Sequence, residues 1–180
     1  MRCAWYLGLC GLMVAMAHAA TQPPPFREYQ IKAVFLYNFA QFVEWPPAVF
    51  PDDQTPLIIG VLGEDPFGRE LDQAVQGERI GARPLQVRRY PRIEDVDSCQ
   101  ILFISRSETS RLDRIFRALQ GKSVLTVGEA DEFSRRGGMI RLITERNRVR
   151  MRINREAAQR ARLSLSSKLL RPAELVRGAN

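Results

Sequence analysis

The stretch LIIGVLGEDP, residues 57–66, decides the fold class of this chain. Its six leading apolar residues, followed by turn-forming residues, are typical of a strand that is buried on both faces. Asp65 and Pro66 suit the N-cap and the first position of a helix, and apolar residues from Leu71 to Val75 would give that helix one buried face. The stretch therefore predicts a strand that leads directly into a helix.

The same alternation of strand and helix continues along the chain. Mainly apolar runs predict further strands at residues 85–88, 101–105, 124–127 and 139–143. Helical spacing of apolar residues predicts helices at residues 27–45, 112–119 and 129–136. Strands and helices that alternate with short connections are typical of an α/β fold with a parallel sheet.

The C-terminal third departs from this alternation. Residues 145–147 are expected to connect the strand at 139–143 to a return strand, in which Val149, Met151 and Ile153 alternate with arginines. Asn154 is the expected N-cap of the next helix. We therefore predict an α/β sandwich with a mainly parallel sheet, helices on both faces and a C-terminal antiparallel hairpin.

The first 19 residues form a separate segment. A positive start at Arg2, an apolar run over residues 3–16 and the sequence Ala17-His18-Ala19 are typical of a secretory signal peptide. An uncleaved membrane anchor is the alternative, although the run is shorter than the ~20 residues that a membrane span needs. We expect residues 1–19 to be a signal peptide and residues 20–180 to form a single exported domain.

Cleavage there would remove His18, the only histidine, and would leave Cys99 as the only cysteine. Sites of the Ser-His-Asp or Cys-His type and structural zinc sites would then lack their residues. Catalysis by carboxylate, lysine or tyrosine stays open, but the acids are scattered and form no calcium loop. We predict no enzyme, no cofactor and no metal, and a Cys99 that is either buried and inert or paired with another chain.

Arginines and leucines are concentrated near the C-terminus of a chain whose net charge is +7. Arg150 and Arg152 fall on one face of the predicted return strand, which either meets an anionic surface or is a solvated edge that charge protects from aggregation. Leucines that form either a core-packed last helix or an apolar patch for a partner follow at Leu163, Leu165, Leu169 and Leu170. Nucleic acid is not an expected partner of an exported chain.

Several blocks of sequence, in this order, resemble the YfiR family. They are KAVFLYNF (32–39), FVEWP (42–46), IGVLGEDPFG (59–68), CQILFIS (99–105), GGMI (137–140), VRMRIN (149–154) and LSSKLL (165–170). The resemblance covers residues 32–170, and the order of the blocks is more specific than any one of them.

The resemblance implies a non-enzymatic periplasmic α/β protein that represses a membrane diguanylate cyclase, or acts on another membrane sensor, by binding its periplasmic part. It also implies relief of repression by an OmpA-like lipoprotein, homodimer formation and an effect on cyclic di-GMP signalling and biofilms. Partner contacts of the family lie near the C-terminus, which suggests Leu163, Leu165, Leu169 and Leu170, and we add Arg150 and Arg152.

The chain departs from some family members in its cysteines. Those members carry internal disulfides, whereas Cys99 has no partner cysteine in the exported domain. An intramolecular redox bridge is therefore excluded for that domain. A second functional hypothesis from a different class is a periplasmic module that binds a small ligand in the crevice between a helix and the sheet.

Overall fold

The computed structural model describes residues 27–176, so the predicted signal peptide lies outside the described residues. The helices are α1 (Glu28–Phe42), α2 (Arg69–Val75), α3 (Leu112–Ala118), α4 (Arg155–Arg160) and α5 (Ser167–Leu170), with 3₁₀ turns at Pro47–Val49, Ile93–Asp95 and Arg106–Arg111. The strands are β1 (Val43–Glu44), β2 (Leu57–Leu62), β3 (Arg79–Ile80), β4 (Arg83–Tyr90), β5 (Ile101–Ile104), β6 (Leu125–Gly128), β7 (Ile140–Glu145), β8 (Arg148–Asn154), β9 (Ser164–Leu165) and β10 (Glu174–Val176).

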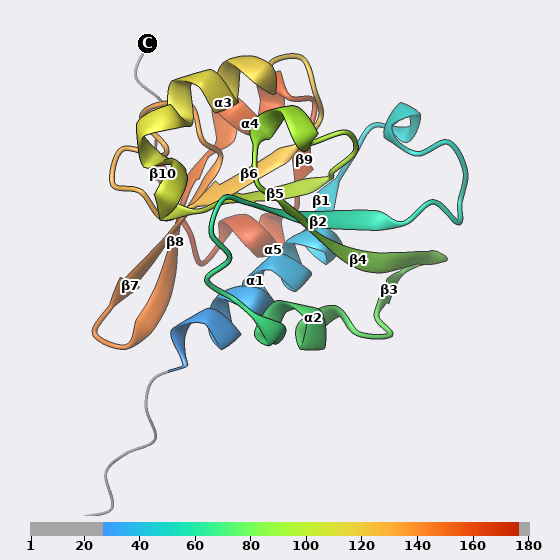
Figure 1. Cartoon of the computed structure of the whole chain (residues 1–180), viewed down its shortest axis with the longest axis horizontal. Coiled ribbons are helices and arrows are strands. Elements are labelled where there is room, and N and C mark those ends of the chain that lie inside the picture. Colours follow the sequence, from blue (N-terminus) through green and yellow to red (C-terminus); the bar gives the residue numbers. More distant parts are fainter. Residues whose placement is uncertain (1–26, 177–180) are drawn as a thin grey trace, which may run out of the picture.

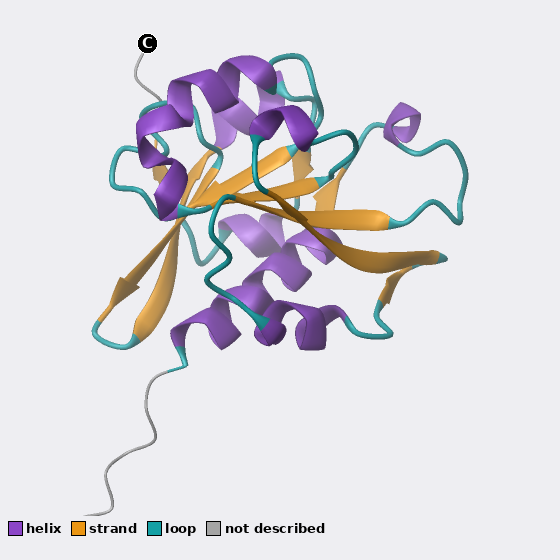
Figure 2. Ribbon diagram, viewed as in Figure 1, coloured by secondary structure: helices purple, strands orange, loops and turns teal. Residues whose placement is uncertain are grey.

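Eight of the strands form one sheet in the order β10-β8-β7-β6-β5-β2-β4-β3. Its pairs are parallel except for β3 with β4 and for the hairpin of β7 and β8. Helices α1, α2 and α5 cover one face, and α3 and α4 lie together on the other (Figures 1 and 2). The predicted α/β sandwich with a mainly parallel sheet and a C-terminal antiparallel hairpin is confirmed.

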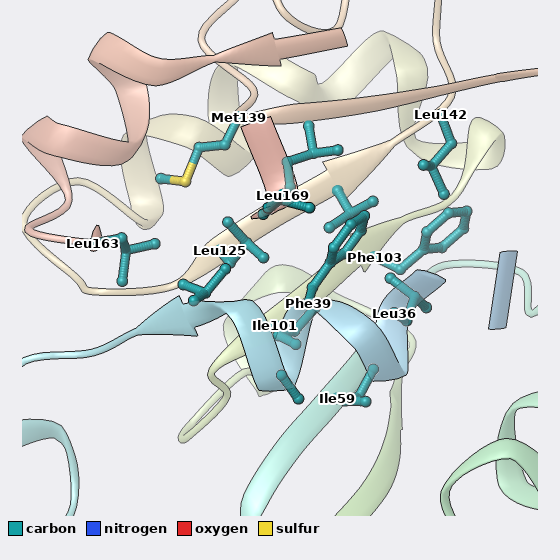
Figure 3. Close-up of a cluster of buried hydrophobic side chains, with 14 of the residues drawn as sticks. Leu36, Phe39, Ile59, Ile101, Phe103, Leu125, Met139, Leu142, Leu163 and Leu169 are labelled. Carbon is teal, nitrogen blue, oxygen red and sulfur yellow. The ribbon is translucent and has the colours of Figure 1, made fainter. Parts of the chain in front are cut away.

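Strands β2 and β5 are apolar without interruption because both of their faces are covered. In β5, Ile101 and Phe103 point into the core beneath α1, whereas Leu102 and Ile104 point into a second core beneath α3. The larger core also takes in Leu36 and Phe39 of α1 (Figure 3). This double burial explains why the stretch that follows residue 57 shows no alternation of apolar and polar residues.

The first helix is shorter than predicted. Helix α1 ends at Phe42 because Val43 and Glu44 continue as a strand paired with β9. Ile31 and Val34 are exposed, while Lys32 is buried in their place. The helix buries Leu36, Phe39 and Ala40 in the core, and Phe35 and Phe42 are partly buried against it.

Two other local predictions are wrong because turns replace the expected helical starts. Asp65 accepts a hydrogen bond from the Phe67 amide at 2.8 Å, and helix α2 begins only at Arg69. Residues 129–136 form successive turns instead of a helix, because they wrap around the buried ring of Phe133. A Cβ atom on Gly138 would lie 2.2 Å from that ring, so the ring fits only against a glycine.

Cys99, which was expected to be either buried and inert or paired with another chain, is a free, buried thiol. Burial raises the pKa of its thiol to about 12, and the Sγ atom lies 2.8 Å from the Ile101 carbonyl oxygen, to which it donates. We expect the folded protein to resist alkylation by iodoacetamide at pH 8, because only the thiolate reacts. Its melting temperature should be the same in oxidising and reducing buffers, and a redox-dependent melting shift at monomeric mass would contradict this prediction.

Candidate partner-binding surface

The carboxyl ends of the parallel strands are the first place to look for a ligand site in this fold. Strands β4 and β5 lie on opposite sides of β2, so the connections that leave β2 and β5 run in opposite directions across the sheet. α/β proteins usually bind ligands at such a point. Here the two loops touch, with the Glu64 amide donating to Ser107 Oγ at 3.0 Å. Gly63 has a φ of +85°, and a Cβ atom there would lie 2.4 Å from Ser107 Oγ.

Charged side chains fill the rest of this edge beneath α1. Lys32 and Glu129 form an ion pair and are only 1% and 2% exposed, and Glu28 also pairs with Lys32. Burial and the Glu129 carboxylate raise the pKa of Tyr29 to about 12, so its phenol stays protonated and donates to Glu129 at 3.3 Å. The crevice between helix and sheet is thus filled by the protein's own side chains.

The outer face of the β7–β8 hairpin is open in contrast. The inner side chains of β7 and β8, such as Leu142 and Met151, pack in the core, and the opposite face carries charge. Register pairs Arg141 with Arg152, Ile143 with Arg150 and Glu145 with Arg148. The hairpin extends beyond the helices (Figure 2), and β10 follows β8 at the edge of the sheet. We call these six residues, with Glu174 of β10, the arginine face.

Ion pairs within the arginine face leave part of its positive charge free. Arg141 pairs with Asp131, and Arg152 pairs with Glu174 at 2.8 Å. Arg150 lies 3.8 Å from Glu145, and among residues 27–176 Arg148 has no acidic partner within 4 Å. The more exposed pairs of Arg150 and Arg152 contribute little to stability, so these two arginines can exchange their partners at low cost.

A shallow hollow beside β10 joins the arginine face to the segment after α5. Its volume is about 410 Å³, and Arg150, Arg152, Arg171, Pro172 and Glu174 are among the residues that line it. The hollow makes this part of the sheet face concave. It also brings together Arg150 and Arg152, both predicted from sequence, with Arg171, which the sequence analysis did not single out.

The structure separates the four predicted leucines into two groups. Leu163 and Leu169 are each 4% exposed and belong to the core beneath α1, with Leu169 visible there in Figure 3. Leu165 and Leu170 are half-buried and pack against the same core. The expected last helix is a single turn, α5, between the short strands β9 and β10. Leu163 and Leu169 therefore offer no surface to a partner in this conformation, and they hold α5 in place.

The buried pair of Lys32 and Glu129 was missed by the sequence analysis. A lysine between apolar residues of a helix is ordinarily placed on the solvent side, and the sequence holds no sign that Glu129, 97 residues away, would neutralise it. The position of Glu129 directly after an apolar strand was the only available signal.

No helix in the described part of the chain is long and apolar enough to cross a membrane.

Comparisons with known proteins identify one family. No curated protein matches the sequence significantly. The profile of the YfiR/HmsC-like family matches residues 29–174, which include every helix and strand of the sandwich except the first residue of α1 and the last two of β10. The chain belongs to the YfiR/HmsC-like family.

Proposed function

We propose that this protein is a non-enzymatic periplasmic regulator that binds the periplasmic part of a membrane diguanylate cyclase and lowers cyclic di-GMP signalling. Membership of the YfiR/HmsC-like family is the observation that carries the proposal. The partner is a cyclase or another membrane sensor, with an OmpA-like lipoprotein as the factor that relieves repression and a homodimer as the resting form.

The arginine face is the proposed contact surface. It lies near an edge of the sheet, its cations Arg148 and Arg150 are exposed, and within residues 27–176 Arg148 has no acidic partner within 4 Å while Arg150 has only Glu145 at 3.8 Å. A partner that matches it carries acidic groups, since complementary charge directs encounter and fixes orientation. A second function as a ligand-binding module gains no support at the crevice between helix and sheet, because Lys32 and Glu129 fill that place.

Cellular cyclic di-GMP tests the proposal. Deletion of the gene should raise the cyclic di-GMP level, and the wild-type gene should restore it. We expect the double variant Arg148→Glu/Arg150→Glu to be exported and folded but unable to restore the low level, because reversed charge repels an acidic partner. The matched control is Arg114→Glu/Arg117→Glu on α3, which makes the same charge change elsewhere and should restore it. An unchanged level after deletion would contradict the proposal.

A further inference from the structure

Two buried polar atoms lack a hydrogen-bond partner in the part of the chain that the structure describes. They are the Ser134 Oγ and Arg141 Nε atoms. Ser134 is 5% exposed, and the Arg141 side chain is 13% exposed. Burying such a group without a partner costs free energy, so each unpartnered atom needs an explanation, and a bound ligand is one.

Both residues line the same cavity. Its volume is about 350 Å³, and its wall also includes Arg135, Arg152 and Glu174. This size lies near the lower limit of small-molecule sites. The cavity occupies the junction between the turns that follow β6 and the strands β7, β8 and β10.

The backbone around the cavity is already held in place. The Ser134 carbonyl oxygen accepts a hydrogen bond from Asn154 Nδ2 at 3.1 Å, and the Asn154 side-chain oxygen caps α4. The neighbouring Phe133 ring is fixed in the core. The unpartnered hydroxyl therefore belongs to an ordered segment, and its lack of a partner is not the result of a loose loop.

The ion pairs in the cavity show which chemical group its arginines bind. The Arg141 guanidinium pairs with the Asp131 carboxylate, and that of Arg152 pairs with Glu174. The Asp131 side chain is 90% exposed and that of Glu174 is 60% exposed, so either carboxylate can move into solvent when another carboxylate takes its place on the arginine. Arg141 and Arg152 are directly opposite each other on β7 and β8, which places two carboxylate-binding groups side by side.

We infer that this cavity binds a small dicarboxylic acid. One carboxylate accepts from Arg141 Nε and Ser134 Oγ and replaces Asp131, while the other replaces Glu174 on Arg152. A dicarboxylate fits better than an anion with one charged group, because the two arginines bind two carboxylates at a fixed distance from each other. Arg141, Arg152 and Glu174 also belong to the arginine face, but the site does not rest on the proposed repression of a cyclase, since its binding is measured on the isolated protein.

Titration with succinate, followed by the NMR signal of the Arg141 Nε–H group, tests this site. We expect saturable shifts up to about 10 mM succinate, and at least about tenfold weaker binding of butyrate, which has one carboxylate of the same chain length. Inorganic phosphate is the second comparison. Equal shifts with succinate, butyrate and phosphate, or no shift with any of them, would overturn the proposal.

Variants separate a binding role from a structural one. Arg141→Lys removes the Nε donor and should weaken succinate binding by about tenfold or more, whereas Arg148→Lys on the same face should leave it unchanged. Asp131→Asn should strengthen binding because it removes the competing carboxylate, which no purely structural role predicts. If Arg141→Lys does not fold, Ser134→Ala provides the same test with a smaller loss. Equal affinity of the wild type, Ser134→Ala and Asp131→Asn would contradict the site.

Discussion

Replacing Lys32 by alanine is expected to lower the free energy of unfolding by about 3–5 kcal/mol. The substitution leaves the Glu129 carboxylate, only 2% exposed, without its buried cation. Arg106 lies 3.3 Å from Glu129, but its side chain is 71% exposed and compensates weakly. Chemical denaturation at pH 7 measures the loss.

The double variant Lys32→Met/Glu129→Leu is the control for this prediction. Removing both charges leaves apolar side chains of similar length beneath α1, and buried pairs replaced in this way often cost little. We expect most of the stability lost in Lys32→Ala to return. If the free energy of unfolding of Lys32→Ala lies within about 1 kcal/mol of the wild-type value, the ion pair is not buried as the structure shows.

Leu169→Ala and Leu163→Ala are each expected to cost about 2–5 kcal/mol of stability, because each leaves a cavity in the core beneath α1. Both leucines are 4% exposed. Leu165→Ala and Leu170→Ala should cost less, since these two side chains are half-buried. Thermal and chemical unfolding of the four single variants measures the difference.

The same four variants distinguish core leucines from contact leucines. A residue at a binding hot spot loses at least about 2 kcal/mol of binding on truncation while its melting temperature stays near that of the wild type. We expect Leu163→Ala and Leu169→Ala to show the opposite pattern, with binding retained by the fraction that is folded. Wild-type stability with lost binding at either position would assign that leucine to the partner surface.

The sheet was predictable because its signals are local. Strands β2 and β5 are uninterrupted apolar runs, and the Glu145–Arg148 turn between β7 and β8 stands out from the alternation on either side. Asn154 caps α4 as expected, accepting from the Ala157 amide at 3.0 Å. A short-range pattern is enough wherever a residue's partners lie within a few positions of it.

The surroundings of the candidate sites depend on contacts between distant residues, so the sequence did not predict them. Lys32 is buried only because Glu129 meets it across 97 positions, and the turns around Phe133 form only because glycines lie against its ring. Leu163 is buried and Leu165 is half-buried although a serine follows each of them in the sequence. No local pattern separates a leucine of the core from one at its margin.

Binding between the purified protein and the periplasmic segment of a diguanylate cyclase from the same genome tests the central claim most directly. We expect isothermal titration calorimetry to show binding by the wild type and by the Arg114→Glu/Arg117→Glu control. Arg148→Glu/Arg150→Glu should bind at least about 30-fold more weakly while it melts at the wild-type temperature. Equal affinity of the three proteins would contradict the arginine face as the contact surface, and absence of binding by the wild type would contradict regulation by contact with that cyclase.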